Sequence, residues 1–455
     1  MIIQNIFKMT ALDIGRAIHS GEVSSSEVTD VFLSKIKSEN KNVFINITED
    51  RARLEAQAAD DRIKTGRKNS LLDGVPIAWK DLFDFKGCII TAGSVLFEDR
   101  SESYEDAVVV KNAAEAGMIS LGKLNMTEMA YSGIGINPHF GTPKNVCSDE
   151  IAFVPGGSSS GSAVSVGLGF VPCAIGTDTG GSVRIPAALN GLVGYKTSEG
   201  RYSRKGLTYL SRSLDTIGPL ARSVTDCSEI DRILCGKGHQ NLVSENYDKP
   251  KFYVVQNIVL DALDDEVEKN FYKAVDTIRA AGFAVEKIEI PVFDKAQRMF
   301  ETVGTLAACD SYLEYNNKLS AFNRERMDQR VLDRILRGQS MKIHDLAKLN
   351  WLRLEGLEEI KDIVGNGFIL MPTCPILAPE INKLENDKEL FHRINLKVLR
   401  NTMFGNFFNM PGLTLPTGKS NIDGRYSAIL ISSKAGSDNW LLKTGQEIQQ
   451  VLDIW

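Results

Sequence analysis

The stretch from Gly156 to Pro186 constrains the fold of this chain more than any other part of its sequence. Two clusters of small residues, GGSSSGS from Gly156 to Ser162 and GTDTGGS from Gly176 to Ser182, lie on either side of an apolar run, Ala163–Ile175. Glycine weakens regular structure, so a glycine cluster beside hydroxyls indicates backbone that approaches something closely. Flexible linkers have a similar composition, but they do not usually enclose a buried apolar run. We therefore expect a site built from backbone, with the apolar run holding the two clusters at a fixed separation.

Outside this stretch, short apolar strands alternate with amphipathic helices. The expected strands are Val43–Ile47, Val75–Trp79, Met118–Gly122, Lys251–Val255, Phe283–Ile290, Phe368–Met371, Leu413–Pro416 and Tyr426–Ser432. The expected helices are one that begins at Ala11 after a Thr10 cap and stops at Gly21, then Ser24–Ile36, Arg51–Arg67, Asp106–Ala116, Val224–Leu234, Asp264–Ala281, Leu396–Phe408 and Trp440–Leu452. The stretch Phe300–Leu354 is expected to be almost wholly helical. This alternation predicts an α/β protein with a mixed β-sheet core covered by helices on both faces. Only a slight break at Asp248–Lys251 interrupts it, so we expect a single domain over residues 1–455.

Composition excludes several functional classes. The net charge of −5 argues against a general affinity for nucleic acid or for an anionic membrane. The seven cysteines are odd in number and contain no CxxC pair, and the five histidines are scattered, so we expect no disulfide framework, metal or other cofactor. The first ten residues lack the apolar core of a signal peptide, and no apolar run approaches the roughly 18 residues of a membrane span. We expect a cytoplasmic protein.

Ser182 is the best candidate for a nucleophile when the residues alone are considered. It follows Thr179-Gly180-Gly181, whose backbone N–H groups could receive the negative charge of an oxyanion. Such a serine needs a base, and His139 is the only histidine nearby. The alternative is a lysine, but Lys80 ends an apolar strand, where a lysine often extends to solvent. Spacing alone therefore leaves the identity of the base open.

Two shorter motifs have little weight. Gly157–Gly161 matches the G-x-S-x-G pattern of a nucleophile elbow with Ser159 at its centre. That elbow requires a strand immediately before it, and Pro155 fits such a strand poorly. Ser34–Lys37 matches S-x-x-K, but it lies on an expected amphipathic helix without catalytic partners.

The two glycine-rich clusters, read as GGSSSGSA and GTDTGGSVRIPAA, resemble the amidase signature family. The resemblance covers nearly the whole chain and extends to DGVPIAWKD from Asp73, LGKLNMTEMA from Leu121, SLDTIGPLARSV from Ser213, MPTCP from Met371 and NMPGLTLP from Asn409. The combination is far more specific than one glycine-rich loop. One departure is Ser160, where the family usually has glycine, which puts the detail of that loop in doubt.

The resemblance implies a Ser-cisSer-Lys catalytic triad. Lys80 follows the apolar strand as the family's lysine does, and Ser158 occupies the position of the serine that follows a cis peptide bond, here Gly157–Ser158. Ser182, 24 residues further on, occupies the position of the nucleophile. Lys80 must be neutral to accept a proton, so its pKa has to fall by burial from roughly 10.4.

The resemblance also implies roles for the residues around the triad. The amides of Thr179, Gly180 and Gly181 would form the oxyanion hole. Two small hydroxyls, those of Thr177 and Ser160, could hydrogen-bond the proton relay. Asp178 and Arg184 are expected to pair and brace the loop rather than to react.

The function implied by the resemblance is hydrolysis of a small-molecule amide through an acyl-enzyme, with release of ammonia or an amine. The acyl side of the pocket should be lined by Tyr131, Ser132 and residues of the late helical region, although Lys123–Phe140 could also be an ordinary loop. The sequence identifies neither the amide nor the oligomeric state, and a homodimer is an option.

The alternative within the family is the glutaminase (A) subunit of a tRNA-dependent amidotransferase. That group commonly has adjacent basic residues in a late helix associated with glutamine recognition. The comparable segment here, Val331–Gly338, places Asp333 beside Arg334, which weakens this interpretation. A catalytically inactive scaffold and a hydrolase of carboxylated ureas or of esters are further alternatives.

Overall fold

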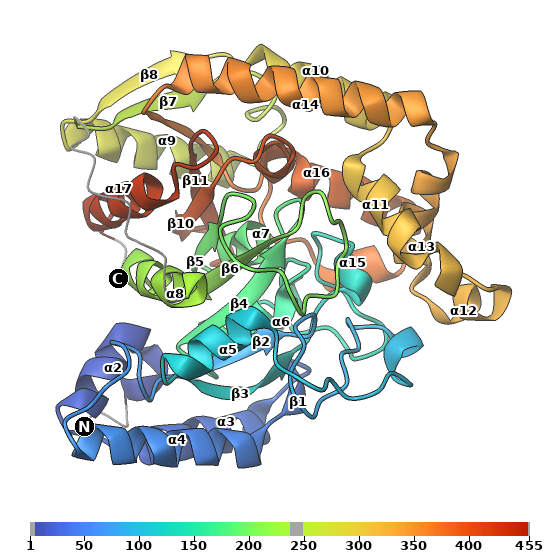
Figure 1. Cartoon of the computed structure of the whole chain (residues 1–455). Helices are drawn as coiled ribbons and strands as arrows, with labels where there is room; N and C mark the ends of the chain where they lie inside the picture. Colours follow the sequence, from blue (N-terminus) through green and yellow to red (C-terminus); the bar gives the residue numbers. More distant parts are fainter. Residues whose placement is uncertain (1–4, 237–248, 454–455) are drawn as a thin grey trace.

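An 11-stranded sheet forms the centre of the computed structural model, which describes residues 5–236 and 249–453 (Figure 1). From one edge to the other, the strands are β1 (Phe44–Ile47), β3 (Ile119–Leu124), β2 (Pro76–Lys80), β4 (Cys173–Asp178), β6 (Thr216–Ala221), β5 (Val193–Lys196), β10 (Gly412–Lys419), β11 (Tyr426–Ser432), β9 (Phe368–Pro372), β7 (Lys251–Val255) and β8 (Ala284–Ile288). Strands β3, β2 and β4 are parallel to one another, as are β9, β7 and β8. In the middle of the sheet, from β4 through β6, β5, β10 and β11 to β9, each strand is antiparallel to its neighbour. The predicted mixed sheet is thus confirmed.

Sixteen α-helices surround this sheet in the described residues. They are α2 (Ala11–His19), α3 (Ser25–Glu39), α4 (Glu49–Lys64), α5 (Val108–Glu115), α6 (Ser160–Gly167), α7 (Arg184–Leu189), α8 (Val224–Cys235), α9 (Asp265–Ala280), α10 (Pro291–Thr302), α11 (Leu306–Tyr315), α12 (Ala321–Arg326), α13 (Gln329–Leu336), α14 (Ile343–Val364), α15 (Ile381–Glu385), α16 (Lys388–Phe407) and α17 (Asp438–Val451). Figure 1 shows α3 and α4 at the end of the molecule near β1 and β3, and α10 and α14 at the opposite end near β7 and β8. The α/β class with helices on both faces of the sheet is confirmed.

Local sequence explains where many of these helices begin. The Thr10 side chain accepts a hydrogen bond from the Asp13 amide at the start of α2. Ser24 and Glu27 form a capping box at the start of α3, in which each side chain accepts from the other residue's backbone N–H. These caps satisfy amides that have no partner inside the helix, which is why the sequence predicts these starts well.

The stretch Phe300–Leu354 is mostly helical, as predicted, but it is divided into several short helices separated by turns. Gly304 has a φ of +117°, a conformation that ends a helix, and Thr305 then caps α11. Ser320 and Asp328 cap α12 and α13 through their side chains. The serine, threonine and aspartate side chains compete for backbone amides, so each restarts the helix in a new direction.

The sheet positions the two glycine-rich clusters of the sequence beside each other. Strands β2 and β4 are neighbours, and every residue in both is buried. Helix α6, which begins within the first cluster, packs on both strands, and the second cluster runs from the end of β4 to the residues just before α7. No helix in residues 5–236 or 249–453 is long and apolar enough to cross a membrane. Asp248, where the slight break in the sequence begins, lies outside the described residues.

Candidate active site

The core of the site is a buried contact between the end of β2 and the first glycine-rich cluster. The Lys80 side chain is fully buried, and its Nζ donates to Ser158 Oγ at 2.6 Å and to Thr177 Oγ1 at 2.8 Å. The Gly157–Ser158 peptide bond is cis, as the sequence predicts. Lys80 therefore does not extend to solvent, and the structure brings together a lysine and two hydroxyls that lie far apart in the chain.

Burial sets the protonation of this lysine. It lowers the pKa of Lys80 from 10.5 to about 7, because the charged ammonium loses its hydration in the interior. The negative charges of Asp215 and Asp178 oppose this effect in part. At neutral pH a substantial fraction of Lys80 is thus uncharged and able to accept a proton.

Ser182 lies between this buried core and an open cavity. It follows Gly181, whose φ of +131° is a conformation that glycine adopts readily, and it lies at the entry to α7. Its side chain lines the cavity, whereas Lys80 and Ser158 are fully buried behind the wall. The Ser182 carbonyl accepts a hydrogen bond from the Ser159 amide at 3.3 Å, which ties the second glycine-rich cluster to the first.

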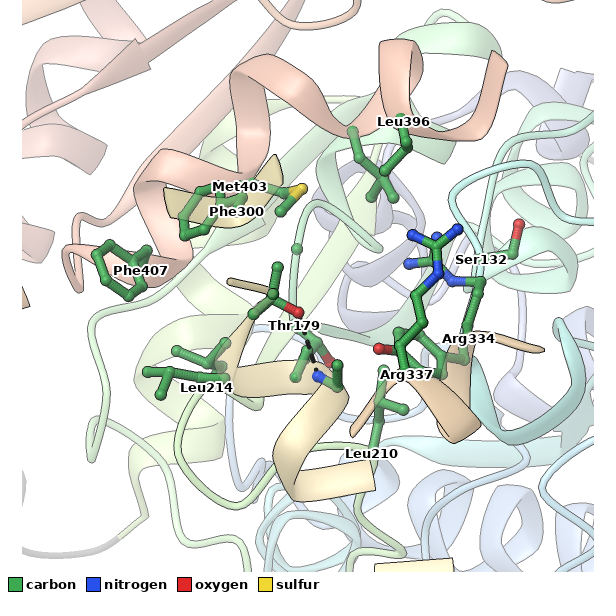
Figure 2. Close-up of a pocket in the computed structure, with 18 of the residues that line it drawn as sticks. Ser132, Thr179, Leu210, Leu214, Phe300, Arg334, Arg337, Leu396, Met403 and Phe407 are labelled. Atoms are coloured by element: carbon green, nitrogen blue, oxygen red, sulfur yellow. Dashed lines mark hydrogen bonds between the residues drawn. The ribbon is translucent and has the colours of Figure 1, made fainter. Parts of the chain in front are cut away.

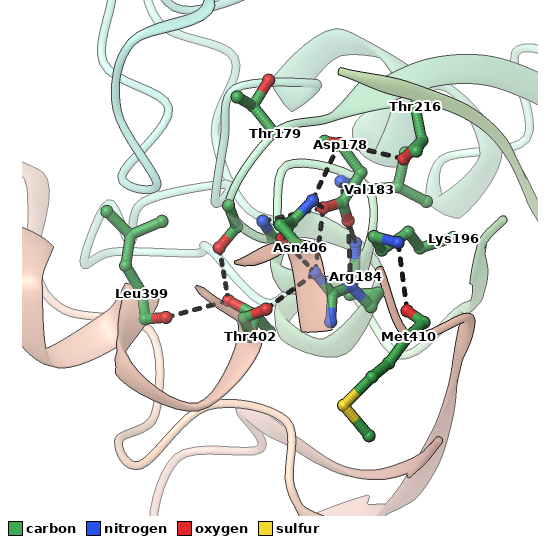
Figure 3. A network of polar contacts seen from close by, with 12 residues as sticks. Asp178, Thr179, Val183, Arg184, Lys196, Thr216, Leu399, Thr402, Asn406 and Met410 are labelled. Atoms are coloured by element: carbon green, nitrogen blue, oxygen red, sulfur yellow. Dashed lines mark hydrogen bonds and ion pairs between the residues drawn. The ribbon is translucent and has the colours of Figure 1, made fainter. Parts of the chain in front are cut away.

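The turn that carries Ser182 is fixed by a buried ion pair (Figure 3). Arg184 and Asp178 are both fully buried, and the guanidinium donates from Nε and Nη2 to the two carboxylate oxygens at 3.0 and 2.9 Å. The expected pairing of these residues is therefore present. Burial alone would raise the pKa of Asp178, but the charge and hydrogen bonds of Arg184 outweigh it and hold that pKa well below its ordinary value. The network continues to Asn406, whose side chain both accepts from Arg184 and donates to Asp178.

Three further contacts refine the expectations for the surrounding polar residues. Thr179 Oγ1 donates to Asp215 Oδ1 at 2.5 Å, and burial raises the pKa of Asp215 to about 6. The Gly181 amide donates to Asp178 Oδ1 at 2.8 Å. Ser160 does not contact the lysine, since its hydroxyl faces the carbonyl of Asn125 at 3.5 Å. Of the two hydroxyls expected near the relay, only that of Thr177 is there.

The cavity in front of Ser182 has a volume of about 470 Å³ (Figure 2). Tyr131 and Ser132 line it, as expected, and so do Thr179 and Gly180. Its outer wall comes from α10, α11, α13 and α16, which is the late helical region anticipated from the sequence. Apolar side chains such as those of Leu210, Leu214, Phe300, Leu399, Met403 and Phe407 cover much of the surface.

Two arginines give this apolar cavity a positive side. Arg334 and Arg337 both line it (Figure 2). The guanidinium of Arg334 lies 4.4 Å from the ring centre of Tyr131. The Arg334 Nε is buried without a hydrogen-bond partner. In the part of the chain that the structure describes, neither guanidinium has a carboxylate within ion-pair distance. Asp333 does not neutralise Arg334, because it contacts Lys388 at 2.5 Å and His392 at 3.3 Å.

The remaining candidates take no part in this centre. His139 Nε2 lies 3.1 Å from Glu128 Oε1, so its ring faces a carboxylate rather than the serines. Ser159 is fully buried, and its hydroxyl faces the Thr177 carbonyl at 3.3 Å. Lys37 of the S-x-x-K match pairs with Glu49 on the surface. Within the described residues, no group of three or more histidine, cysteine or acidic side chains is arranged to hold a metal ion.

Sequence reasoning missed two residues of the site. Asp215 lies within SLDTIGPLARSV, but no spacing rule indicates that it reaches Thr179. Arg334 enters the sequence analysis only through the helix compared with the glutamine-recognition helix of the amidotransferase subunits, where Asp333 beside it counts against that role. Its position opposite Tyr131 depends on a contact between segments far apart in the chain.

Comparisons with known proteins agree with one another, and each match extends over almost the whole chain. The Amidase family model matches residues 27–442. The A subunit of the glutamyl-tRNA(Gln) amidotransferase of Pseudomonas syringae pv. syringae (strain B728a) is 31% identical over 484 residues, which cover 98% of each chain. A solved structure described as an amidase has a TM-score of 0.84 at 28% identity, covering 97% of this chain and 99% of that one. A second solved structure comes from a vestigial protein complex described as revealing the evolutionary origins of an s-triazine catabolic enzyme. Its TM-score is 0.87 at 25% identity, and the match covers 98% of this chain and 99% of that one.

Proposed function

Because the chain belongs to the amidase family, we propose that it hydrolyses a carboxamide C–N bond through an acyl-enzyme on Ser182. The observation that carries the proposal is the 2.6 Å contact between the buried Lys80 Nζ and Ser158 Oγ. A lysine whose pKa burial lowers to about 7 is suited to act as a base at neutral pH. The cavity on the other side of Ser182 is large enough for a small amide.

In the first step, neutral Lys80 accepts a proton from Ser158 while Ser158 accepts one from Ser182. The Ser182 oxygen attacks the amide carbon and forms the tetrahedral intermediate. The proton on Lys80 returns through Ser158 to the leaving nitrogen, and the C–N bond breaks to release ammonia or an amine. Water then cleaves the acyl ester by the same proton route, which restores the Ser182 hydroxyl.

The negative charge on the carbonyl oxygen requires hydrogen-bond donors. Thr179 and Gly180 line the cavity, and neither of their backbone amides donates a hydrogen bond within the described part of the chain. The Gly181 amide already donates to Asp178, so we assign the oxyanion hole to Thr179 and Gly180 rather than to all three amides. The hydrogen bond from Thr179 Oγ1 to Asp215 fixes the first of these donors in place.

The charge of the cavity favours an amide whose acyl part carries a carboxylate. The buried Arg334 Nε has no partner, and such a donor is costly to leave unsatisfied. Arg337 adds a second positive charge on the same wall. A guanidinium binds a carboxylate with two parallel hydrogen bonds, which makes it specific for that group. The arginine side of the cavity would therefore hold the acid group while the amide carbon reaches Ser182.

Ammonia release from matched pairs of amides tests this function. Each pair consists of an ω-amide of a dicarboxylic acid and its methyl ester, and L-glutamine is included. We expect wild-type enzyme to prefer the acid member, and Arg334→Gln to raise KM for it by about 10-fold or more with kcat little changed. Equal rates for both members of every pair would remove the carboxylate from the proposal, and no ammonia from any amide would remove the hydrolysis.

A second candidate is the glutaminase subunit of a tRNA-dependent amidotransferase. It is favoured by the 31% identity to such a subunit over 98% of both chains. The objection from the sequence loses its force, because Asp333 pairs with Lys388 and leaves Arg334 facing the cavity. Glutamine itself is an amide that carries a carboxylate. If glutamine is the best substrate and purified chain hydrolyses it slowly until partner subunits are added, this candidate replaces a free-standing amidase.

A further inference from the structure

Glu128 lies outside the proposed catalytic centre, yet it joins two segments that each supply residues to the cavity, Ala130–Ser132 and the helix of Arg334. Its side chain is fully buried, and Oε1 accepts from Ser94 Oγ at 2.6 Å. The other oxygen, Oε2, accepts from the backbone amide of Asp328 at 2.7 Å. Asp328 is the residue that caps α13, the helix that carries Arg334. One buried carboxylate thus joins two segments that are 200 residues apart.

The segment that follows Glu128 forms the inner wall of the cavity. Ala130, Tyr131 and Ser132 all line it. Met129 and Ala130 have φ values of +49° and +60°, a left-handed conformation that costs free energy in residues other than glycine. Such a wall needs to be held by its surroundings, and the fully buried side chain of Glu128 is at its start.

The two segments meet again at Tyr131 and Arg334. The guanidinium of Arg334 stacks on Tyr131 at 4.4 Å, three residues after Glu128. The hydrogen bond at Asp328 fixes where α13 begins, and the stacking fixes where its arginine lies. A shift of α13 by even about 1 Å would move the guanidinium out of register with a bound carboxylate.

We propose that Glu128 is a positioning residue that sets the specificity of the enzyme for carboxylate-bearing amides. It acts through Arg334 by holding the start of α13 against the inner wall of the cavity. The proposal rests on the function proposed above, since it assumes that Arg334 binds the acid group. Glu128 does not touch the reacting atoms and takes no part in proton transfer.

Asp328→Pro and Asp328→Ala form a matched pair for testing this role. Asp328 has a φ of −59° and the preceding Met327 has a ψ of 157°, so proline fits the backbone at this position. Both substitutions remove the capping carboxylate, but only proline also removes the backbone N–H that donates a hydrogen bond to Glu128. The difference between the two variants therefore reports the loss of that hydrogen bond, together with the proline ring that takes the place of the N–H. Glu128→Met, which keeps the volume, removes the same acceptor together with the contacts of Glu128 to Ser94 and His139, and it is a second, less selective variant.

Steady-state kinetics with the acid and ester members of one amide pair give the first readout. We expect Asp328→Pro and Glu128→Met to raise KM for the acid member about 10-fold relative to Asp328→Ala, with kcat and the ester kinetics changed less than about 2-fold. In an Arg334→Gln background the same changes should have no further effect on KM, because the interaction they support is already gone. Equal losses for both members, or additive losses in that background, would show a merely structural role and overturn the proposal.

Hydrogen–deuterium exchange gives a second readout that does not depend on substrate. Relative to Asp328→Ala, Asp328→Pro should speed exchange in residues 128–133 and 329–338 together. Faster exchange in 329–338 alone would overturn the proposed link. If wild-type enzyme hydrolyses no carboxylated amide while both segments loosen together, the proposed function fails and the link stands as a structural one, without its role in specificity.

Discussion

Replacing Asp215 by asparagine should move the acid limb of the pH–rate profile to lower pH. Asp215 is buried, and its carboxylate accepts hydrogen bonds from Thr179 Oγ1 at 2.5 Å and from the Leu210 amide at 2.9 Å. Its negative charge favours the protonated form of Lys80 and so raises the pKa of that lysine against the effect of burial. The asparagine side chain in the variant would be neutral, so Lys80 should lose its proton more easily.

The size of the shift follows from the pKa values. The pKa of Lys80 falls from 10.5 to about 7, which corresponds to about 5 kcal/mol of preference for the neutral form. At pH 7 about half of the lysine is then neutral, against about one part in 3,000 for an ordinary lysine. A nearby opposite charge shifts a pKa by about 1 unit or more. Burial raises the pKa of Asp215 itself to about 6, so this carboxylate is mostly charged at pH 7 and loses its charge at lower pH. We therefore expect Asp215→Asn to lower the pKa of Lys80, and with it the midpoint of the pH–rate profile, by about 1.

The assay is kcat/KM between pH 5 and pH 9 with the best amide substrate. In wild-type enzyme it should rise with a single ionisation near pH 7, since the active form of Lys80 is the neutral one. Asp226→Asn serves as the control, because this carboxylate is also buried but accepts from the Ala11 and Leu12 amides instead. The midpoint of its pH–rate profile should equal that of the wild type. A midpoint for Asp215→Asn that is unchanged or higher would refute the reasoning.

Three further predictions concern the base and the turn around the nucleophile. Arg184→Met should lower the free energy of unfolding in urea by about 3–5 kcal/mol, because it leaves a buried carboxylate without its partner. Lys80→Arg should lower kcat by several orders of magnitude because a guanidinium stays protonated, whereas a folded His139→Gln should stay active because the His139 ring faces a carboxylate. If rate assays give the reverse result, the base is a histidine. Gly181→Ala should lower the thermal unfolding midpoint more than Gly180→Ala, because a Cβ at 181 would lie 2.1 Å from a threonine oxygen and one at 180 would be in ordinary contact; equal midpoints would contradict this packing.

Much of the fold was predictable because it is written in local patterns. Strand β2 is an apolar run from Pro76 to Trp79 ended by Lys80, and every residue in it is buried. The Thr10 and Ser24 caps and the glycine after α9 mark helix ends within one or two residues. What spacing could not decide was the direction of Lys80, because burial depends on α6 and β4, which come about 80 to 95 residues later.

The site was predictable where it depends on the two glycine-rich clusters and not where it depends on long-range partners. Thr177 contacts Lys80 because β4 lies beside β2, whereas Ser160 turns toward Asn125 at the start of α6. Arg334 reaches the cavity only because α13 packs against the wall that contains Tyr131. Contacts of this kind join segments whose order in the sequence carries no information about their distance.

Trapping the acyl group tests the central claim most directly. The best amide substrate is mixed with enzyme, quenched in acid within the first turnover, and the digested protein is mapped by mass spectrometry. The account predicts the acyl mass on the peptide that contains Ser182, and none on Ser182→Ala, which should fold normally and retain less than about 1% of the activity. An acyl group on any other residue, or a Ser182→Ala variant of wild-type thermal stability that keeps more than a few per cent of activity, would contradict the account.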